Sequence, residues 1–527
     1  MSVGINNYMK EKGSMKTRSV KYFLQKEVLF LTFVIIIAIS ATGYFKFIKH
    51  HTGLPGGCDE FGYLQLSDYI STGNVLNNHN HKDFINELSG HLINQGFEHA
   101  DYEFLLTPHC HHIDKYSGEK VLQYPLGTSF FLSLFSKDIR PQIFPVIIFL
   151  FFLVPIYFSF FYLNYSKSKI IQSSIFLILI ISYAIDKFPF AWHLRDINSV
   201  SITFGLLFAA GILIREKPFL SILLISATVN FRLGNIVLLP VAILFYLDFQ
   251  KNKLSTLIIK TLKISSLSFI IGPLIYIIYV YLLTGKFFHT TYSIIDTTSN
   301  FNFEKLVSNI YFYFDFQKDW FRCQILSFII LLVIFLKKWV TKKELFLLYF
   351  ITFFNYVFYL THNVVIDYYP YATLILIYGF IFGRVIDNLK SNIKYEKYIL
   401  YFLIILIVMS GLYFKLNQKK DSDYIGIYYS EVKKYRDCFQ DQDVVWSEDS
   451  SGTVEYATNA LGFRYRWGGS NSNIESIKWL RDNRMNQIIW LDDLKFNNNI
   501  KKELEDNNIK YEKYVCIGLG EMIYILQ

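Results

Sequence analysis

A polar segment directly after the first hydrophobic run reads Pro55-Gly-Gly-Cys-Asp59-Glu60-Phe-Gly-Tyr63-Leu-Gln-Leu-Ser-Asp-Tyr69. The proline and the two glycines break a helix and permit a tight turn. Beyond the turn, apolar side chains recur at positions 63, 66, 69 and 70, which predicts a short amphipathic helix. Because such a helix can lie in a membrane interface, the segment predicts that two carboxylates, Asp59 and Glu60, are held at a membrane surface.

The composition is that of a polytopic α-helical membrane protein. The chain has 527 residues, of which 52% are hydrophobic and 18% aromatic, and its mean hydropathy is +0.28. Apolar runs long enough to cross a bilayer recur along most of the sequence. The net charge is +9, and the basic residues lie mostly in short loops between these runs. The apolar runs make the lipid bilayer an expected partner. Nucleic acid is not expected, because the sequence has no basic soluble stretch with interspersed aromatic residues.

The hydrophobic runs divide the chain into three expected parts: a cytoplasmic segment 1–27, a transmembrane domain 28–414 whose first extracytoplasmic loop is 46–126, and an extracytoplasmic domain 415–527. About eleven spans are expected. They cover approximately 28–44, 142–163, 170–185, 198–214, 218–229, 233–248, 257–283, 322–336, 344–361, 371–386 and 398–414. The apolar run 128–135 is too short to cross and is expected to lie at the interface.

Lysine and arginine residues follow the alternation of sides that this topology requires. Every loop expected inside carries several of them, as in Lys337, Lys338, Lys342 and Lys343, whereas the outer loop 361–371 carries none. This asymmetry predicts a multi-pass protein of the cell (plasma or inner) membrane, with the N-terminus in the cytoplasm and the long first loop and the C-terminus outside.

Residues 415–527 change character from the rest of the chain. Short apolar runs at 444–446, 487–491 and 522–526 are typical of buried strands, and 474–484 and 499–505 are typical of helices. Because strand and helix alternate, a small α/β domain is expected.

The five cysteines show no zinc-site spacing. If both polar regions face an oxidising compartment, Cys58 and Cys110 form one possible disulfide, and Cys438 and Cys516 form another. Five unpaired cysteines are the alternative.

The Asp59–Glu60 pair is the first candidate for chemistry. Adjacent helical residues point about 100° apart, so the two carboxylates do not face each other. One of them is therefore expected to act as a base and the other as a metal ligand or a support. Ordinary solvated loop charges are the alternative interpretation.

Arg232 is the second candidate. The spans on either side are short, about 18 and 24 Å at 1.5 Å per residue, so their Asn230-Phe231-Arg232 turn is expected below the outer surface. An ionisable group at that depth is a functional candidate, and a guanidinium can bind a lipid phosphate through two hydrogen bonds. A structural ion pair with a carboxylate of another span is the alternative.

Two outer turns combine polar and aromatic groups. The turn with His193, Arg195 and Asp196 is a candidate site or an interfacial anchor, and the turn with Asp367 and Tyr368 can line a sugar site. The cluster His109-Cys110-His111-His112 resembles a metal site only in composition, because consecutive residues rarely fit one tetrahedral ion. No metal ligand is assigned there.

In this order, the motifs resemble those of polytopic glycosyltransferases of the GT-C fold, which include polyprenyl-phosphate-sugar mannosyltransferases and the aminoarabinose and Rgt-like transferases. The resemblance spans nearly the whole chain. It rests on Asp59-Glu60 before Tyr63, Tyr124-Pro125-Leu126-Gly127, Asn230-Phe231-Arg232 and Asp367-Tyr368-Tyr369-Pro370. Leu126 stands where the family motif has a second proline. This difference affects the expected entry to the next helix and leaves the expected fold unchanged.

The resemblance implies a hexosyl- or pentosyltransferase that takes sugar from a polyprenyl-phosphate donor and transfers it, with inversion, to a lipid, glycan or protein acceptor outside the cytoplasm. Asp59 is then the general base, and Arg232, with Arg195 as a second candidate, offsets charge on the departing phosphate. Some members use a divalent metal such as Mg or Mn at the acidic motif. The implied substrate-binding residues are Tyr63, Tyr124, His193, Arg195, Asp196, Arg232, Asp367 and Tyr368.

Two alternative functions remain. An O-antigen polymerase or ligase is also polytopic, but such enzymes typically place their large loop later in the chain. A lipid-linked sugar flippase or transporter needs polar groups along a path near the midplane, whereas the candidate charges here cluster towards one side.

Overall fold

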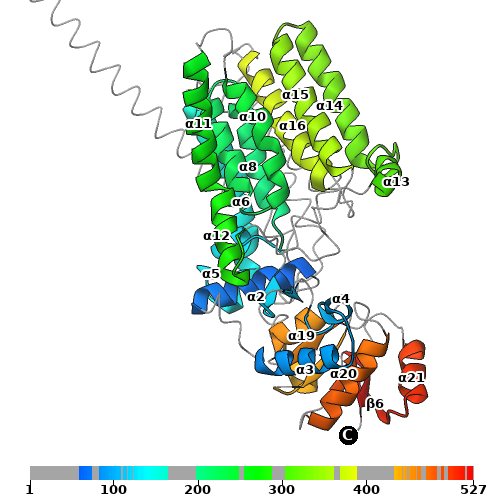
Figure 1. Cartoon of the computed structure of the whole chain (residues 1–527). Coiled ribbons are helices and arrows are strands. Elements are labelled where there is room, and N and C mark those ends of the chain that lie inside the picture. The colour runs from blue at the N-terminus through cyan, green and yellow to red at the C-terminus, as the bar shows by residue number, and fades with distance from the viewer. Residues whose placement is uncertain are drawn as a thin grey trace, which may run out of the picture.

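The computed structural model describes residues 58–73, 82–108, 111–115, 117–122, 124–163, 197–247, 254–287, 303–360, 368–388, 432–441, 443–447, 450–458, 460–464, 470–483, 488–491, 497–516 and 519–525. These residues form a helical part, α6 to α16, and an α/β unit at one end of it, and helix α2 (Cys58–Thr72) crosses between the two (Figure 1). Helix α2 and the elements packed around it form the candidate site.

The helical part contains α6 (Arg140–Tyr162), α8 (Val200–Leu213), α9 (Pro218–Thr228), η3 (Leu233–Leu238), α10 (Leu239–Tyr246), α11 (Leu254–Ile271), α12 (Pro273–Thr284), α13 (Phe303–Tyr313), α14 (Asp319–Leu336), α15 (Lys342–Tyr359) and α16 (Tyr368–Asn388). Helices α8 and α16 form its centre. Their backbones touch at two glycines: a Cβ on Gly211 would lie 2.8 Å from the nitrogen of Phe380, and one on Gly379 would lie 2.9 Å from the carbonyl carbon of Phe208.

The expected spans 142–163, 198–214, 218–229, 322–336, 344–361 and 371–386 each correspond to one α-helix, and 233–248 contains η3 followed by α10. The expected span 257–283 is different, because it breaks at Gly272 into α11 and α12, which are bent by 41°. Pro273 supplies no N–H for a continuous helix and begins α12 instead. The expected spans 28–44, 170–185 and 398–414 lie outside the described residues.

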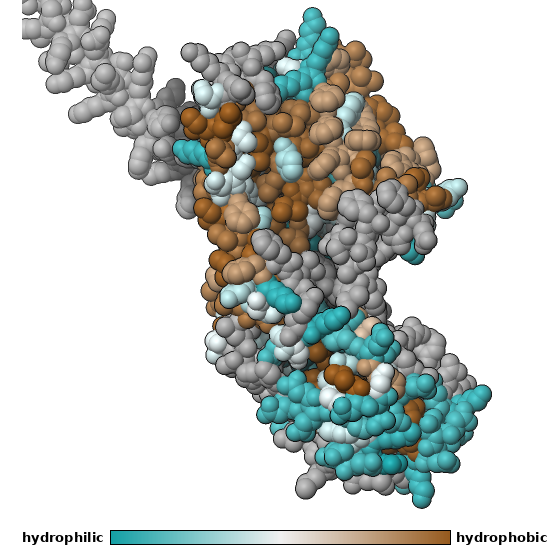
Figure 2. Space-filling view, in the orientation of Figure 1, coloured by the Kyte–Doolittle hydropathy of each residue, from teal (hydrophilic) through white to brown (hydrophobic). Residues whose placement is uncertain are grey.

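Among the described residues, Pro370–Asn388 is long and apolar enough to cross a membrane, and the bent pair of α11 and α12 passes the same test as one span. Several shorter apolar helices accompany them. Their outward surface is strongly apolar: Ile259 and Leu262 of α11 are 65% and 62% exposed, and Leu336 of α14 is 71% exposed. Figure 2 shows the helical part as mostly brown, with some white and teal residues among the brown. Apolar surface of this extent marks contact with a membrane or another protein.

The α/β unit is built on a five-stranded mixed sheet with strand order β4-β3-β5-β7-β6. The strands are β3 (Val444–Trp446), β4 (Leu461–Phe463), β5 (Ile488–Leu491), β6 (Tyr511–Cys516) and β7 (Gly520–Ile525). Strands β4, β3 and β5 run parallel, and β7 is antiparallel to both β5 and β6. The helices α19 (Ser451–Ala457), α20 (Ser470–Asn483) and α21 (Asn497–Asp506) connect them, so the three predicted strands and two predicted helices are present.

The first loop completes the core of this unit. It contributes α3 (Lys82–Asn94), α4 (His99–Tyr102), β1 (His111–Ile113) and β2 (Lys120–Leu122). Buried side chains of α3, such as Leu88 and Leu92, share one apolar cluster with Trp446 and Leu480. Arg464 fixes the loop backbone, because its guanidinium donates to the carbonyl oxygens of Phe104 (3.2 Å) and His111 (2.7 Å). Two stretches of chain far apart in sequence therefore fold as one unit.

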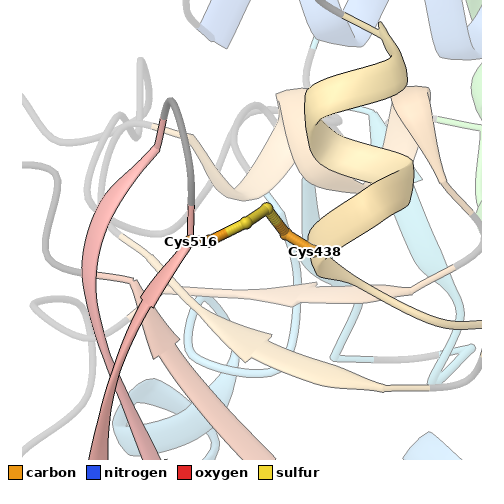
Figure 3. Close-up of a disulfide and its surroundings, with 2 residues drawn as sticks. All are labelled: Cys438 and Cys516. Carbon is orange, nitrogen blue, oxygen red and sulfur yellow. A yellow bond between two sulfur atoms is a disulfide. The ribbon is translucent and has the colours of Figure 1, made fainter.

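A disulfide joins Cys438 and Cys516, with 6.0 Å between their Cα atoms (Figure 3). It connects the helical segment 432–438 to the end of β6. The other possible pair, Cys58 with Cys110, stays a prediction, because Cys110 and the Cys58 side chain are outside the described part of the chain.

A buried ion pair joins the first loop to α19. Lys120 Nζ lies 2.7 Å from Glu455 Oε1, and the two side chains are 6% and 11% exposed. Burial lowers the pKa of Lys120, but Glu455 and the Tyr69 hydroxyl of α2 overcome this and raise it to about 12. Since this folded-state pKa lies above the usual value of about 10.4, the stabilisation is fully present below pH ~10 and is lost as the pH rises through 12.

We expect Lys120→Met to lower the free energy of unfolding by about 3–5 kcal/mol at neutral pH, because it leaves the Glu455 carboxylate buried without its cation. Adding Glu455→Leu should restore most of this loss. Thermal unfolding of the detergent-solubilised chain measures both effects, with the exposed Lys115→Met in the same hairpin as control. Equal unfolding temperatures for the Lys120→Met and Lys115→Met variants would contradict a role for the pair.

Candidate functional site

Helix α2 is the first wall of the site. Asp59 and Glu60 lie in its first turn, where negative charge interacts favourably with the helix dipole. The expected interfacial helix is covered more fully than predicted: Phe61, Tyr63 and Leu64 are all buried. The α/β unit covers one side of α2, and α5 (Gly127–Ser133) and the helical part cover the other. The amphipathic pattern of the sequence predicts one buried face of α2 and does not show that both sides of the helix are covered.

The two adjacent carboxylates have different surroundings. Glu60 is 5% exposed and accepts a hydrogen bond of 3.0 Å from the backbone N–H of Ile197, just before α8. The Asp59 side chain is 33% exposed. Glu60 therefore holds the chain at the entry to α8, which fits the supporting role, and Asp59 is the carboxylate that an incoming molecule can reach.

The Tyr124–Gly127 motif and the Asn230–Arg232 turn meet directly. The Gly127 N–H donates to the carbonyl oxygen of Asn230 at 2.9 Å. A Cβ at position 127 would lie 2.6 Å from that oxygen, so only glycine fits at this contact. The Asn230 side chain in turn donates to the Ile271 carbonyl at 2.7 Å, next to the break between α11 and α12. A carbonyl next to the break therefore holds the turn in place.

Arg232 is mostly buried within this turn and faces α2. Its side chain is 11% exposed, and Nη2 lies 4.0 Å from Oδ2 of Asp59. The guanidinium carbon lies 4.8 Å from the centre of the Tyr368 ring and 5.9 Å from that of Tyr124. Cation–π contacts of this kind hold a guanidinium without using its N–H donors. The structure therefore brings together Asp59, Tyr124, Arg232 and Tyr368, which were predicted from separate motifs.

Tyr368, at the start of α16, is fixed by polar partners inside the helical part. Its hydroxyl lies 2.8 Å from Oδ1 of Asn235 and 3.1 Å from Oγ1 of Thr203. Its ring stacks on Phe204 with 5.8 Å between centroids. Tyr368 therefore presents a rigid aromatic face to Arg232.

Tyr63 and Tyr124 form the other aromatic wall, stacked with 5.4 Å between ring centroids. The Tyr124 hydroxyl is hydrogen-bonded to the Asp59 carboxylate. Burial and the charge of Asp59 raise the pKa of Tyr124 well above its ordinary value. The tyrosine therefore stays protonated and can donate to Asp59, which orients this carboxylate.

Four predicted site residues, His193, Arg195, Asp196 and Asp367, lie outside the described residues and stay predictions. The segment around His111 and His112 is described, and it is a buried hairpin of β1 and β2. His111 packs against Phe61 with 5.4 Å between ring centroids, so it supports α2 from behind.

Sequence reasoning missed Arg140, which is 2% exposed. It donates from Nε to the carbonyl oxygens of Leu132 and Phe135 at the end of α5, and from Nη2 to the Ser71 hydroxyl at 2.9 Å. It also forms an ion pair with Asp68. Arg140 thus locks α2 onto α5. The available signal in the sequence was an arginine directly before a long apolar run. Arginines at such positions usually lie at the membrane interface, so this signal alone does not indicate a buried role.

No family model matches this sequence, and no curated protein matches it either. Two solved structures are similar to it, both of ArnT from Cupriavidus metallidurans. The one bound to undecaprenyl phosphate has a TM-score of 0.48 at 10% sequence identity, covering 93% of this chain and 97% of that one. The apo structure has a TM-score of 0.45 with the same identity and coverage.

Proposed function

We propose that this chain is a membrane glycosyltransferase that moves a sugar from a polyprenyl-phosphate donor to an acceptor hydroxyl. The observation that carries the proposal is the reachable Asp59 carboxylate 4.0 Å from the mostly buried Arg232 guanidinium, between aromatic walls. A carboxylate and a fixed cation side by side suit a transfer in which one group removes a proton and the other receives a phosphate. The order of the sequence motifs, which resembles that of GT-C transferases, agrees with it.

In the proposed reaction, the oxygen of the acceptor hydroxyl attacks the anomeric carbon of the donor sugar. Asp59 takes the proton from this hydroxyl during the attack. The bond from that carbon to the phosphate oxygen breaks, and the leaving polyprenyl phosphate carries the electron pair away. Attack opposite to the leaving group inverts the anomeric configuration. Arg232 offsets the negative charge that develops on the phosphate, which enters beside Asp59 and replaces part of its contact with the guanidinium.

The surrounding residues have supporting parts in this scheme. Tyr124 orients Asp59, Tyr368 holds Arg232, and Glu60 fixes the chain before α8. The proposal retains Tyr63, His193, Arg195, Asp196 and Asp367 as substrate-binding residues, with Arg195 as a second cation for the phosphate. Aromatic rings can line such a pocket against the apolar face of a sugar, while polar side chains orient its hydroxyls.

A divalent ion such as Mg or Mn does not fit an Asp59–Glu60 pair in this arrangement. Glu60 is buried and its Oε1 already accepts the Ile197 N–H, and adjacent helical side chains diverge by about 100°, so no shared ion is assigned to the pair. Within the described ranges, no group of three or more His, Cys, Asp or Glu side chains is placed to hold a metal. No step is therefore assigned to a metal, and transfer measured with and without EDTA tests this choice.

We also propose that the site faces outward from the cell membrane. Helix α16 begins at the site with Tyr368 and carries Arg384 near its other end, where Arg384 pairs with Glu216 at 3.5 Å and Asp387 at 2.7 Å. With a rise of 1.5 Å per residue, these ends are about 24 Å apart. The lysine-bearing loop 337–343 joins the Arg384 end, because Glu344 pairs with Arg215 next to Glu216. Positive loops at the far end favour a cytoplasmic assignment for that end.

For this orientation, we expect a cysteine introduced at the exposed Asn483 of α20 to react with a membrane-impermeant maleimide in intact cells. A cysteine at the exposed Lys337 should react only after lysis, and the parent chain controls for the native cysteines. The reverse pattern would place the site in the cytoplasm and contradict the proposed donor side.

The function itself is tested with the purified chain in lipid nanodiscs. Radiolabelled polyprenyl-phosphate sugars are offered together with glycolipid, glycan and peptide acceptors, and labelled product is measured. Donor flipping in proteoliposomes is measured in parallel. Flipping without transfer for every donor tried would replace the proposal with the flippase interpretation.

A further inference from the structure

Helix α19 of the α/β unit is clamped between α2 and the sheet, with a glycine at each contact. On one side, a Cβ at Gly452 would lie 2.6 Å from Cδ1 and 2.8 Å from Cβ of Phe61 in α2. On the other side, a Cβ at Gly462 in β4 would lie 2.9 Å from the carbonyl carbon of Ser451. At these two contacts the Phe61 side chain of α2 packs directly on the backbone of α19, and the backbone of α19 packs directly on that of β4.

Phe61 transmits this contact to the site. Its side chain has no exposed surface and is also enclosed by His111, so it cannot swing away from α19. It lies two residues after Asp59 in the same helix. A second connection runs from Glu455 of α19 through Lys120 to Tyr69 of α2. Because a packed helix moves as a body, a displacement of α19 displaces Asp59.

We propose that α19 sets the position of Asp59 over the acceptor and that Gly452 is the positioning residue at this contact. The inference rests on the proposed function. It gives the α/β unit a part in the transfer step, because the sheet becomes the fixed support of the helix that carries the base. A misplacement of about 1 Å at a reacting group costs on the order of 10²-fold in rate, so a methyl group at this contact is enough to matter.

The positions of the site residues predict that a shift of α2 affects turnover more than donor binding. The groups proposed to receive the donor phosphate, Arg232 and Tyr368, belong to the turn after α9 and to α16, and neither element carries Phe61. A shift of α2 moves Asp59 and also the proposed substrate-binding Tyr63, but it leaves the groups that receive the phosphate in place. It is therefore expected to lower kcat much more than it raises the donor KM. A general loss of structure would instead lower the amount of active protein and the unfolding temperature.

The test is Gly452→Ala, with Gly90→Ala as a matched control. Gly90 lies in α3 of the same α/β unit, and nothing is within 4 Å of a Cβ built there. We expect Gly452→Ala to lower kcat by roughly 10- to 100-fold. The donor KM should stay within about twofold, and Gly90→Ala should behave as wild type.

Rescue supplies the decisive result. Phe61→Leu makes room at the contact, so the Gly452→Ala/Phe61→Leu double variant should have a higher kcat than Gly452→Ala alone. Wild-type kcat in folded Gly452→Ala, or a double variant worse than both single variants, would overturn the inference. If Gly452→Ala does not fold, Phe61→Leu alone is used: it should lower kcat with the donor KM kept, and an unchanged kcat would overturn the inference.

Hydrogen exchange of the α2 backbone in the full-length chain distinguishes failure of this inference from failure of the proposed function. Faster exchange across 58–72 in Gly452→Ala than in Gly90→Ala supports the coupling even if no donor is ever transferred. Unchanged exchange and unchanged kcat in an active enzyme reject the coupling and leave the glycosyltransferase proposal intact.

Discussion

Replacing Asp59 by asparagine is expected to lower sugar transfer by ~10²–10⁴-fold, the usual range for loss of a general base. An amide has the shape of the carboxylate but cannot take the acceptor proton. Asp59 is the reachable carboxylate of its pair, and the Tyr124 hydroxyl orients it. Folding should be nearly unchanged, because the Asp59 side chain is one-third exposed and its contact with Arg232 is long. The measurement is turnover of radiolabelled donor by purified protein.

Two further variants control the Asp59 result. Asp83→Asn removes an exposed carboxylate of α3 by the same chemical change and should leave turnover unaltered. Glu60→Gln should reduce turnover less than Asp59→Asn and should lower the unfolding temperature instead, since Glu60 accepts the buried Ile197 N–H. Turnover within a few-fold of wild type in Asp59→Asn would exclude this residue as the base and make Glu60 the next candidate.

Arg232→Ala is expected to weaken use of the donor by about 1.5–3 kcal/mol, the range for a hydrogen bond to a charged group. This corresponds to roughly 10- to 100-fold in kcat/KM. The physical reason is that the mostly buried guanidinium, which the aromatic rings of Tyr124 and Tyr368 hold beside Asp59, is placed to donate hydrogen bonds to the phosphate. Arg232→Lys should retain part of the activity, because the charge stays and the planar fork is lost.

The alternative for Arg232 is a structural ion pair with Asp59. In that case, Arg232→Ala should lower the unfolding temperature and leave the donor affinity of the folded fraction intact. Asp59→Asn should then lower the unfolding temperature by a similar amount, because either change removes the same pair. Arg322→Ala, at an exposed position of α14, controls for loss of an arginine near the same end of the helical part.

Helix positions followed closely from hydropathy, because an apolar stretch between charged loops is a strong and local signal. The break inside 257–283 was missed, although Gly272-Pro273 was visible, because the apolar pattern continues across it. Helix α13, which lies between the expected spans 257–283 and 322–336, was also missed, since it is short and amphipathic. The union of α3 with the C-terminal sheet depends on contacts across more than three hundred residues, which no local pattern encodes.

At the site, the sequence identified residues better than it identified their partners. Asp59, Tyr124, Arg232 and Tyr368 were chosen from separate motifs, and the structure brings them together. Their supports were not predictable: Asn235 and Thr203 behind Tyr368 are ordinary polar residues within apolar stretches. A side chain that orients another leaves no periodicity or spacing, so it becomes visible only when the fold places it.

The pairing of the first loop with the C-terminal sheet has a consequence for how the protein is made. Lys120 and Glu455, which meet at this junction, are 335 positions apart. At a synthesis rate of about 5–20 residues per second, the loop emerges roughly 20–70 s before its partner is translated. During that interval the apolar face of α3 lacks the sheet and α20 and has only neighbours from its own loop, such as Tyr102 and Leu105. We therefore expect the newborn loop to depend on a chaperone or the membrane surface. A stop codon anywhere before β3 would leave the loop permanently in that state and make it a target for proteolysis.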